Sequence, residues 1–421
     1  MNLKNSHENL ETSTKRDLWS HPWGYTESFV IAAELLILGF ILEFVTGGKG
    51  IAPISMPYNF YILISFTGIL IALRVFYSHN SVVKWLSGVP AAISSITAFA
   101  LITMLMGFIP QSENNSPGFL SLIGLTHLKS SWPILLIQFY LLSSLGLVSL
   151  KRVYPFKGKN IGFLLNHLGL WLTLVAALFG SGDLKRLTIN LLEDGKPNNI
   201  AISQNTGAYK LPFELKLLNF HIDEYVPRIV LVNANTGKFL LEKGEAAIPV
   251  ELGKTYKLKK WSVTIDKYLE DAILTDTILS EKLINGSFPA VFVTAINTVD
   301  GRELKGWLGT GSFAYDPRFI NLENDIILAL TMPEVKKYRS DVVVTRDNEI
   351  VDTVSIEVNK PYNISGWKVY QISYDQNKGK WSTLSVLEVV SDPWLKIVFI
   401  GIFMMFGGSA YLFWIGRKKI N

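Results

Sequence analysis

Six stretches of the chain are apolar for long enough to cross a lipid bilayer, which takes roughly 20 mostly apolar residues in a helix. A long segment of different character separates the fifth stretch from the sixth. The pattern therefore predicts six transmembrane helices, at about Phe29 to Val45, Tyr58 to Tyr77, Leu86 to Ile109, Trp132 to Leu150, Ile161 to Gly180 and Trp394 to Ile415.

The 211 residues from Ser181 to Ser391 show the two-residue period of β-strands rather than a helical one. Phe213, Leu215 and Leu217 alternate with polar or flanking residues. The alternation then shifts by one position at Phe220, as a β-bulge requires. We expect a large β-rich domain, an antiparallel sandwich or barrel, inserted before the last transmembrane helix.

Composition agrees with a membrane protein, because only 18% of the residues are charged and 49% are hydrophobic. Soluble domains carry about 25% charged residues. The chain contains no cysteine. This excludes disulfides, Cys-ligated zinc or iron–sulfur sites, and a Cys-x-x-Cys-His haem attachment site in this chain.

The positions of Lys and Arg predict the orientation, because short cytoplasmic segments are enriched in them. With the N-terminus in the cytoplasm, the inner segments hold 12 Lys and Arg residues, and the short outer loops hold only Lys49 and Lys129. We expect both termini to be cytoplasmic. The predicted parts are a tail (1–27), five helices (28–180), an extracytoplasmic β-rich domain (181–391), a sixth helix (392–416) and a basic tail (417–421).

Ionisable side chains inside a membrane are expensive to bury and are therefore functional candidates. His167 lies within the fifth predicted helix, where its imidazole is either an iron ligand or a hydrogen-bond partner for another helix. His79 and His127 lie at helix boundaries, where ordinary interfacial solvation is the alternative to a ligand role. Glu34, in the first helix, is a proton-relay group, a partner of a histidine or a protonated carboxyl near the interface.

Several short motifs occur in a fixed order around the β-rich segment. They are Ser130-Ser131-Trp132-Pro133, Asn166-His167-Leu168-Gly169-Leu170-Trp171, Gly182-Asp183-Leu184-Lys185-Arg186-Leu187, Leu211-Pro212-Phe213-Glu214-Leu215-Lys216-Leu217, Tyr370-Gln371-Ile372-Ser373-Tyr374-Asp375, Asp392-Pro393-Trp394 and Gly407-Gly408. This ordered set, from about Ser130 to Gly416, resembles the ResB-like family of cytochrome c biogenesis proteins.

The resemblance implies a component of the system II cytochrome c maturation machinery in the cytoplasmic membrane. It implies partners, namely a CcsA/ResC-type haem-handling membrane protein, an apocytochrome c with Cys-x-x-Cys-His, and membrane lipid, but no nucleic acid. The cofactor implied is transiently bound haem b. His167 is the best match to the family's transmembrane haem ligand, with His79 and His127 as weaker candidates and Asn166 and Glu34 as possible support.

Two questions stay open under this resemblance. The chain is either a subunit of a cytochrome c haem lyase complex or a non-catalytic scaffold that docks the partner and the apocytochrome, with all haem ligands on the partner. The predicted helices also outnumber those commonly described for the family, and nothing in the sequence explains the additional N-terminal pair.

Overall fold

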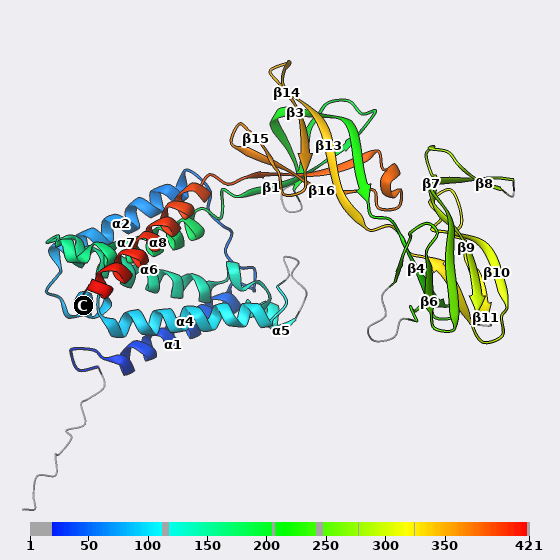
Figure 1. The fold of residues 1–421 in the computed structure, drawn as a ribbon. Coiled ribbons are helices and arrows are strands. Elements are labelled where there is room, and N and C mark those ends of the chain that lie inside the picture. The colour runs from blue at the N-terminus through cyan, green and yellow to red at the C-terminus, as the bar shows by residue number, and fades with distance from the viewer. Residues whose placement is uncertain are drawn as a thin grey trace, which may run out of the picture. The chain divides into compact units, whose positions relative to one another are not determined.

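The computed structural model describes residues 19–111, 118–203, 207–240, 247–276, 278–323 and 325–418. The chain divides into two compact units (Figure 1). The helical unit comprises residues 1–184 and 392–421, and the β-rich unit comprises residues 185–391. The ends of the predicted tails, before residue 19 and after residue 418, lie outside the described residues.

Six helices of the helical unit are long and apolar enough to cross a membrane, which confirms the prediction. They are α1 (Tyr25–Val45), α2 (Tyr58–Phe76), α4 (Val89–Phe108), α6 (Trp132–Val153), α7 (Ile161–Phe179) and α8 (Leu395–Lys418). Shorter elements lie in the connections: α3 (Ser81–Leu86), α5 (Phe119–Leu122) and the 3-10 turns η1 (Leu125–Ser130) and η2 (Gly158–Asn160). Such short elements carry no long apolar run, so hydropathy alone does not reveal them.

Helix α1 begins at Tyr25, a full turn before the apolar run that predicts it. The Glu27 carboxylate accepts a hydrogen bond from the backbone N–H of Gly24 at 2.8 Å, which satisfies a donor that the helix start leaves unpaired. Glu34 is therefore the tenth of 21 helical residues and lies near the middle of α1.

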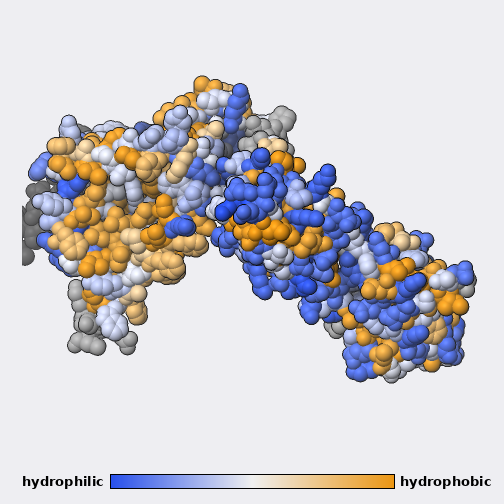
Figure 2. Space-filling view, turned by 90° about the horizontal axis from the view of Figure 1, so that it is seen from above, coloured by the Kyte–Doolittle hydropathy of each residue, from blue (hydrophilic) through white to orange (hydrophobic). Residues whose placement is uncertain are grey.

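The sides of the long helices remain covered with apolar side chains. Phe29, Ile69 and Phe403 are among the exposed large residues of α1, α2 and α8. Helix α6 is the most enclosed of the six, with 61% of its apolar window buried. Hydrophobic residues (orange) spread over the helical part in Figure 2, whereas the β-rich part is mixed. The chain is thus a multi-pass membrane protein, with α6 inside its helical unit.

Helices α7 and α8 pack through glycines. A Cβ added to Gly169 would lie 2.6 Å from the backbone oxygen of Gly401, and one added to Gly408 would lie 2.9 Å from the backbone nitrogen of Asn166. Small residues let helix backbones approach closely in membranes, where packing drives association. Gly169 therefore allows α8 to pack closely against α7.

An eight-stranded antiparallel sheet forms a nearly closed barrel in the β-rich unit, which confirms the predicted class. Its strand order is β14-β13-β3-β2-β1-β17-β16-β15. The strands are β1 (Lys185–Leu192), β2 (Asn198–Ser203), β3 (Gly207–Glu224), β13 (Val335–Arg346), β14 (Glu349–Glu357), β15 (Tyr362–Ile364), β16 (Trp367–Tyr374) and β17 (Leu384–Ser391).

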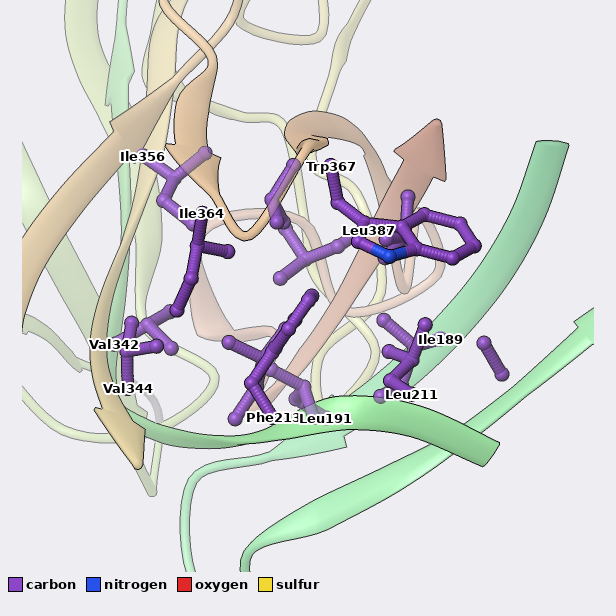
Figure 3. Packing of buried hydrophobic residues seen from close by; sticks show 14 of the residues in the cluster. Ile189, Leu191, Leu211, Phe213, Val342, Val344, Ile356, Ile364, Trp367 and Leu387 are labelled. Atoms are coloured by element: carbon purple, nitrogen blue, oxygen red, sulfur yellow. The ribbon is translucent and has the colours of Figure 1, made fainter. Parts of the chain in front are cut away.

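The barrel core gathers inward-facing side chains from all parts of this sheet, including Phe213, Val344, Trp367 and Leu387 (Figure 3). The pairing of β3 with β13 shifts register between Leu217 and Asn219. This is the bulge that the change of alternation predicts, and it turns Phe220 into the core.

Two smaller antiparallel sheets complete the β-rich unit and share a second core. One has the order β10-β9-β7-β6, with β8 paired to β7, and the other has the order β11-β12-β4-β5. Their strands are β4 (Arg228–Asn233), β5 (Ile248–Pro249), β6 (Thr255–Leu258), β7 (Trp261–Thr275), β8 (Ile278–Glu281), β9 (Phe288–Asn297), β10 (Glu303–Gly309), β11 (Ile320–Glu323) and β12 (Ile326–Leu330). Leu231, Trp261 and Val291 belong to this core.

The barrel also encloses a small polar network. The Ser340 hydroxyl lies 2.5 Å from Oε1 of Gln371 and 2.6 Å from the Ser385 hydroxyl, and all three side chains are buried. Buried polar groups require such partners. Gln371 belongs to the Tyr370-Gln371 motif, and this network is the structural role that the motif serves.

Candidate functional site

His167 lies on α7, where its ring stacks on Phe163 one turn earlier, with ring centroids 3.6 Å apart. Its Nδ1 lies 3.0 Å from the Phe163 carbonyl oxygen. A carbonyl oxygen only accepts hydrogen bonds, so Nδ1 carries the proton. The lone pair is then on Nε2, which is the atom a metal would take, and the side chain is half-buried.

Arg152, at the end of α6, extends this stack. Its guanidinium carbon lies 4.8 Å from the centroid of the Phe163 ring, and its Nη1 donates to Oδ1 of Asn160 at 3.3 Å. A cation, an aromatic ring and an imidazole therefore follow one another in space. The guanidinium retains further N–H donors that suit a carboxylate.

Asn166 does not contact His167 but faces α8. Its Oδ1 accepts a hydrogen bond from the Ser409 hydroxyl at 3.1 Å. This contact lies beside Gly408, at one of the close approaches of the two helices. Asn166 thus fixes the α7–α8 pair, and its predicted support of a haem ligand stays a prediction.

His127 is the most enclosed of the three candidate histidines, with 9% of its side chain exposed. Its Nε2 lies 3.1 Å from Oε1 of Glu43, a carboxylate with no exposed side-chain surface. Iron binding through Nε2 would require this pair to separate.

Two other candidates are exposed and lie apart from His167. The Nδ1 of His79 lies 3.2 Å from the Ser78 hydroxyl, at the end of α2. Glu34 has no hydrogen-bond partner among the described residues, and its side chain points away from the protein interior midway along α1. The structure does not bring these predicted residues into one site.

Two groups among the described residues have the chemistry that haem binding requires. His167 supplies a free imidazole nitrogen and Arg152 a nearby cation, which match an axial ligand and a counter-charge for a propionate. Neither of the two main cavities in the described part of the chain is lined by His167. The described His, Asp and Glu residues also form no group of three that could hold a bare metal ion. The imidazole and the guanidinium are thus compatible with haem in their chemistry, and on these residues alone they do not enclose it.

A second cluster joins three distant segments of the helical unit around Asp183. The pattern of histidines in the sequence does not reveal it. Oδ2 of Asp183 accepts hydrogen bonds from Nδ2 of Asn59 and Nε1 of Trp394, both at 2.7 Å. Its Oδ1 accepts from the backbone N–H of Met56 at 2.7 Å. The Gly182-Asp183 and Asp392-Pro393-Trp394 motifs, 211 residues apart, thus meet where the chain leaves and re-enters the helical unit. In the sequence, this cluster is indicated only by the presence of both motifs in the ordered set described above.

The β-rich unit contains an acidic hollow of about 250 Å³, lined in part by Glu224, Tyr268, Glu270 and Lys380. Burial raises the pKa of the Glu224 carboxyl, and Lys380 opposes this effect. Burial, followed by the surrounding carboxylates, raises the pKa of Tyr268 to about 12. Lys380 is itself bound to Asp271, with 2.6 Å between Nζ and Oδ1.

The lone histidine of the β-rich unit, His221, has an ordinary surface environment. Its Nε2 lies 3.2 Å from Oδ2 of Asp341 on the neighbouring strand, and 43% of its side chain is exposed. Such a cross-strand pair fits a strand residue and gives no indication of a ligand site.

Comparison with known proteins gives one family match. The model of the ResB-like family matches residues 316–387, which run from the connection between β10 and β11 into β17 within the β-rich unit. No curated protein matches the chain. The matched region includes Ser340, Gln371 and Ser385 of the buried network, and it excludes His167. The match confirms the resemblance of this chain to the ResB-like family and indicates, at the level of that family, a role in cytochrome c biogenesis.

Proposed function

We propose that this protein handles haem at the cytoplasmic membrane as a component of the system II cytochrome c maturation machinery. It acts with a CcsA/ResC-type membrane partner and supports the covalent attachment of haem to an apocytochrome c that carries Cys-x-x-Cys-His. The family match in the β-rich unit and the free imidazole nitrogen of His167 support this proposal.

In this function, Nε2 of His167 would hold the iron of a transiently bound haem b. The hydrogen bond from Nδ1 to the Phe163 carbonyl holds the required tautomer and ring orientation. Arg152 is placed to attract a propionate. Bound haem supplies the iron porphyrin whose vinyl groups are joined to the thiols of the apocytochrome. A second nitrogen ligand would come from the partner or from another histidine of this chain.

We also propose that both termini are cytoplasmic and that the β-rich unit is extracytoplasmic. The support is the distribution of Lys and Arg, which concentrates on the connections between α2 and α4 and between α6 and α7. The β-rich unit would then present the apocytochrome or brace the complex on the side where haem attachment takes place.

The tautomer of His167 is the observation that carries the proposal, and a His167→Ala variant tests it. The chain and its partner are co-expressed and co-purified, and haem staining, an absorption spectrum and the yield of mature cytochrome c are measured. We expect the variant to lose the wild-type spectrum and most of the cytochrome yield while the complex still forms. His221→Ala, which removes an exposed histidine of the β-rich unit, is the matched control.

A scaffold function is the alternative, and the family match favours it because that match lies in the β-rich unit and does not include His167. In that case all haem ligands belong to the partner. An unchanged spectrum and unchanged cytochrome yield in His167→Ala, with loss of yield only when the complex no longer assembles, would establish the scaffold and refute the ligand role.

A further inference from the structure

The helical unit contains a basic cavity at the end where α2 and α6 finish and α7 starts, which we call the basic end. The cavity has a volume of about 320 Å³. Arg74 in the last turn of α2, Lys84 of α3 and Lys151 in the last turn of α6 line it, together with the hydroxyl-bearing Ser78 and Ser87. Three cations from three helices thus surround one hollow.

Among the described residues, these cations form no ion pair with a carboxylate. The chain between Glu43 and Asp183 contains a single acidic residue, Glu113, which lies outside the described residues. Among the described residues, Arg74 donates to the carbonyl oxygen of Tyr154, at 3.3 Å, and not to a carboxylate. Like charges that converge in this way repel one another unless an anion joins them.

We propose that this cavity binds the phosphate group of an anionic phospholipid. Basic pockets between transmembrane helices are the sites at which acidic headgroups bind. The three cations would hold the phosphate, and the two serine hydroxyls would donate to its remaining oxygens. This site is separate from His167, and the inference does not depend on haem handling.

The surroundings of the cavity favour a lipid over a free anion. Its wall includes the buried apolar side chains of Val83 and Leu147, which suit the glycerol and the start of an acyl chain. The aromatic side chains of Phe76 and Tyr154 are 78% and 79% exposed beside it. Exposed aromatic rings at helix ends are typical of the membrane–water interface, where headgroups lie.

The lining also argues against haem as the occupant, although haem carries two carboxylates. None of the described lining residues is a histidine, methionine or tyrosine that could bind iron. The nearest candidate, His79, is no part of the wall and bonds to Ser78 through Nδ1. The cavity therefore matches an anion without a metal.

A pair of double variants with equal charge tests the proposal. Lys84→Gln/Lys151→Gln removes two cations of the cavity, and Lys157→Gln/Lys159→Gln removes two exposed cations of the same end that do not line it. The full-length variants, purified in detergent, are titrated with phosphatidylglycerol that carries a fluorescent acyl chain. We expect the first variant to bind about 25-fold more weakly than wild type, from the roughly fivefold effect of each lysine, and the second to bind as wild type does.

Competition identifies the source of the phosphate. Inorganic phosphate, glycerol phosphate and haemin are each added to the wild-type complex at the concentration of the lipid. We expect none to displace the lipid, and phosphatidylcholine to bind weakly. Displacement by either soluble phosphate would make the cavity a free-anion site, and displacement by haemin would make it a haem site. Either result would overturn the proposal.

A charge-preserving variant distinguishes loss of charge from misfolding. Lys84→Arg/Lys151→Arg retains both cations and is expected to bind phosphatidylglycerol within about twofold of wild type. All variants are compared by melting temperature and elution profile. Equal loss of binding in both glutamine double variants would show that surface charge in general, and not the cavity, attracts the lipid.

Discussion

The two ends of the helical unit differ in whether their charged side chains have partners of opposite polarity within the protein. At the end where α1 and α7 finish, which we call the carboxylate end, Glu43 accepts hydrogen bonds from the backbone N–H groups of Gly50 and Trp132, at 2.8 and 3.0 Å, and faces His127. Asp183 is likewise bound by three donors. At the basic end, the three cations of the cavity form no ion pair with a carboxylate among the described residues.

This contrast indicates that the carboxylate end serves the stability of the fold and that the basic end serves the binding of an anion. A buried carboxylate surrounded by donors from distant segments fixes those segments, because each donor would be left unpaired if the carboxylate moved away. Cations that form no ion pair contribute little to fixing the fold, and they remain available to an anion from outside. We therefore expect substitutions at the carboxylate end to affect stability and those at the basic end to affect binding.

Glu43→Ala should have the largest effect on stability. It leaves His127 and two backbone N–H groups without their acceptor in a site closed to water, which destabilises by about 3–5 kcal/mol when a buried pair loses one member. The melting temperature of the full chain in detergent measures this loss. Glu34→Ala on the same helix is the control, and we expect no loss because its side chain is exposed and makes no hydrogen bond among the described residues.

Equal melting temperatures for Glu43→Ala and wild type would remove the contrast between the two ends. The comparison becomes sharper if His127→Ala is destabilising as well and the double variant loses less than the sum of the two single losses. That result would show that the two side chains act as a pair.

Trp394→Phe should have an intermediate effect. The substitution keeps an aromatic ring in the buried position and removes only the Nε1–H that donates to Asp183. Loss of a hydrogen bond to a charged group corresponds to about 2 kcal/mol. Trp414→Phe, at an exposed position of α8, is the matched control in the same melting experiment. A loss equal to that of the control would show that Asp183 does not need this donor.

The fold could be predicted largely from the sequence because its signals are local. Apolar runs give the six long helices, and alternation gives the β-rich unit together with the bulge before Phe220. The start of α1 could not be placed from hydropathy, because the pairing of Gly24 with Glu27 adds a polar first turn. The strand order of the barrel depends on pairings between distant segments, which no local pattern contains.

The sequence identifies individual candidate residues of the site but not the contacts between them. A histidine within an apolar run identifies His167, but its tautomer depends on the contact with Phe163. The pairing of Glu43 with His127 joins residues 84 positions apart, and the meeting of Asp183 with Trp394 joins residues 211 apart. The basic cavity draws on three helices, so its cations are visible in the sequence while their convergence is not.

Glu224 extends the comparison to the β-rich unit. Glu43 and Asp183 accept hydrogen bonds from several donors, whereas burial is the main influence on the Glu224 carboxyl and raises its pKa. Between the ordinary value of 4.5 and the raised value, the folded state binds more protons than the unfolded state. Stability therefore falls as the pH rises through this window. Glutamine keeps the shape without the charge, so Glu224→Gln should melt a few degrees above wild type at pH 7.5 and together with wild type at pH 4.

Glu251→Gln provides a control of opposite sign for this smallest effect. The Lys254 ammonium donates to the Glu251 carboxylate and lowers its pKa, so the charged form is favoured in the folded state. Glu251→Gln should accordingly be slightly less stable than wild type at pH 7.5 and approach it at low pH. If both glutamine variants change stability in the same direction between pH 4 and pH 7.5, burial does not set the charge of Glu224. The contrast between carboxylates with and without donors would then hold only in the helical unit.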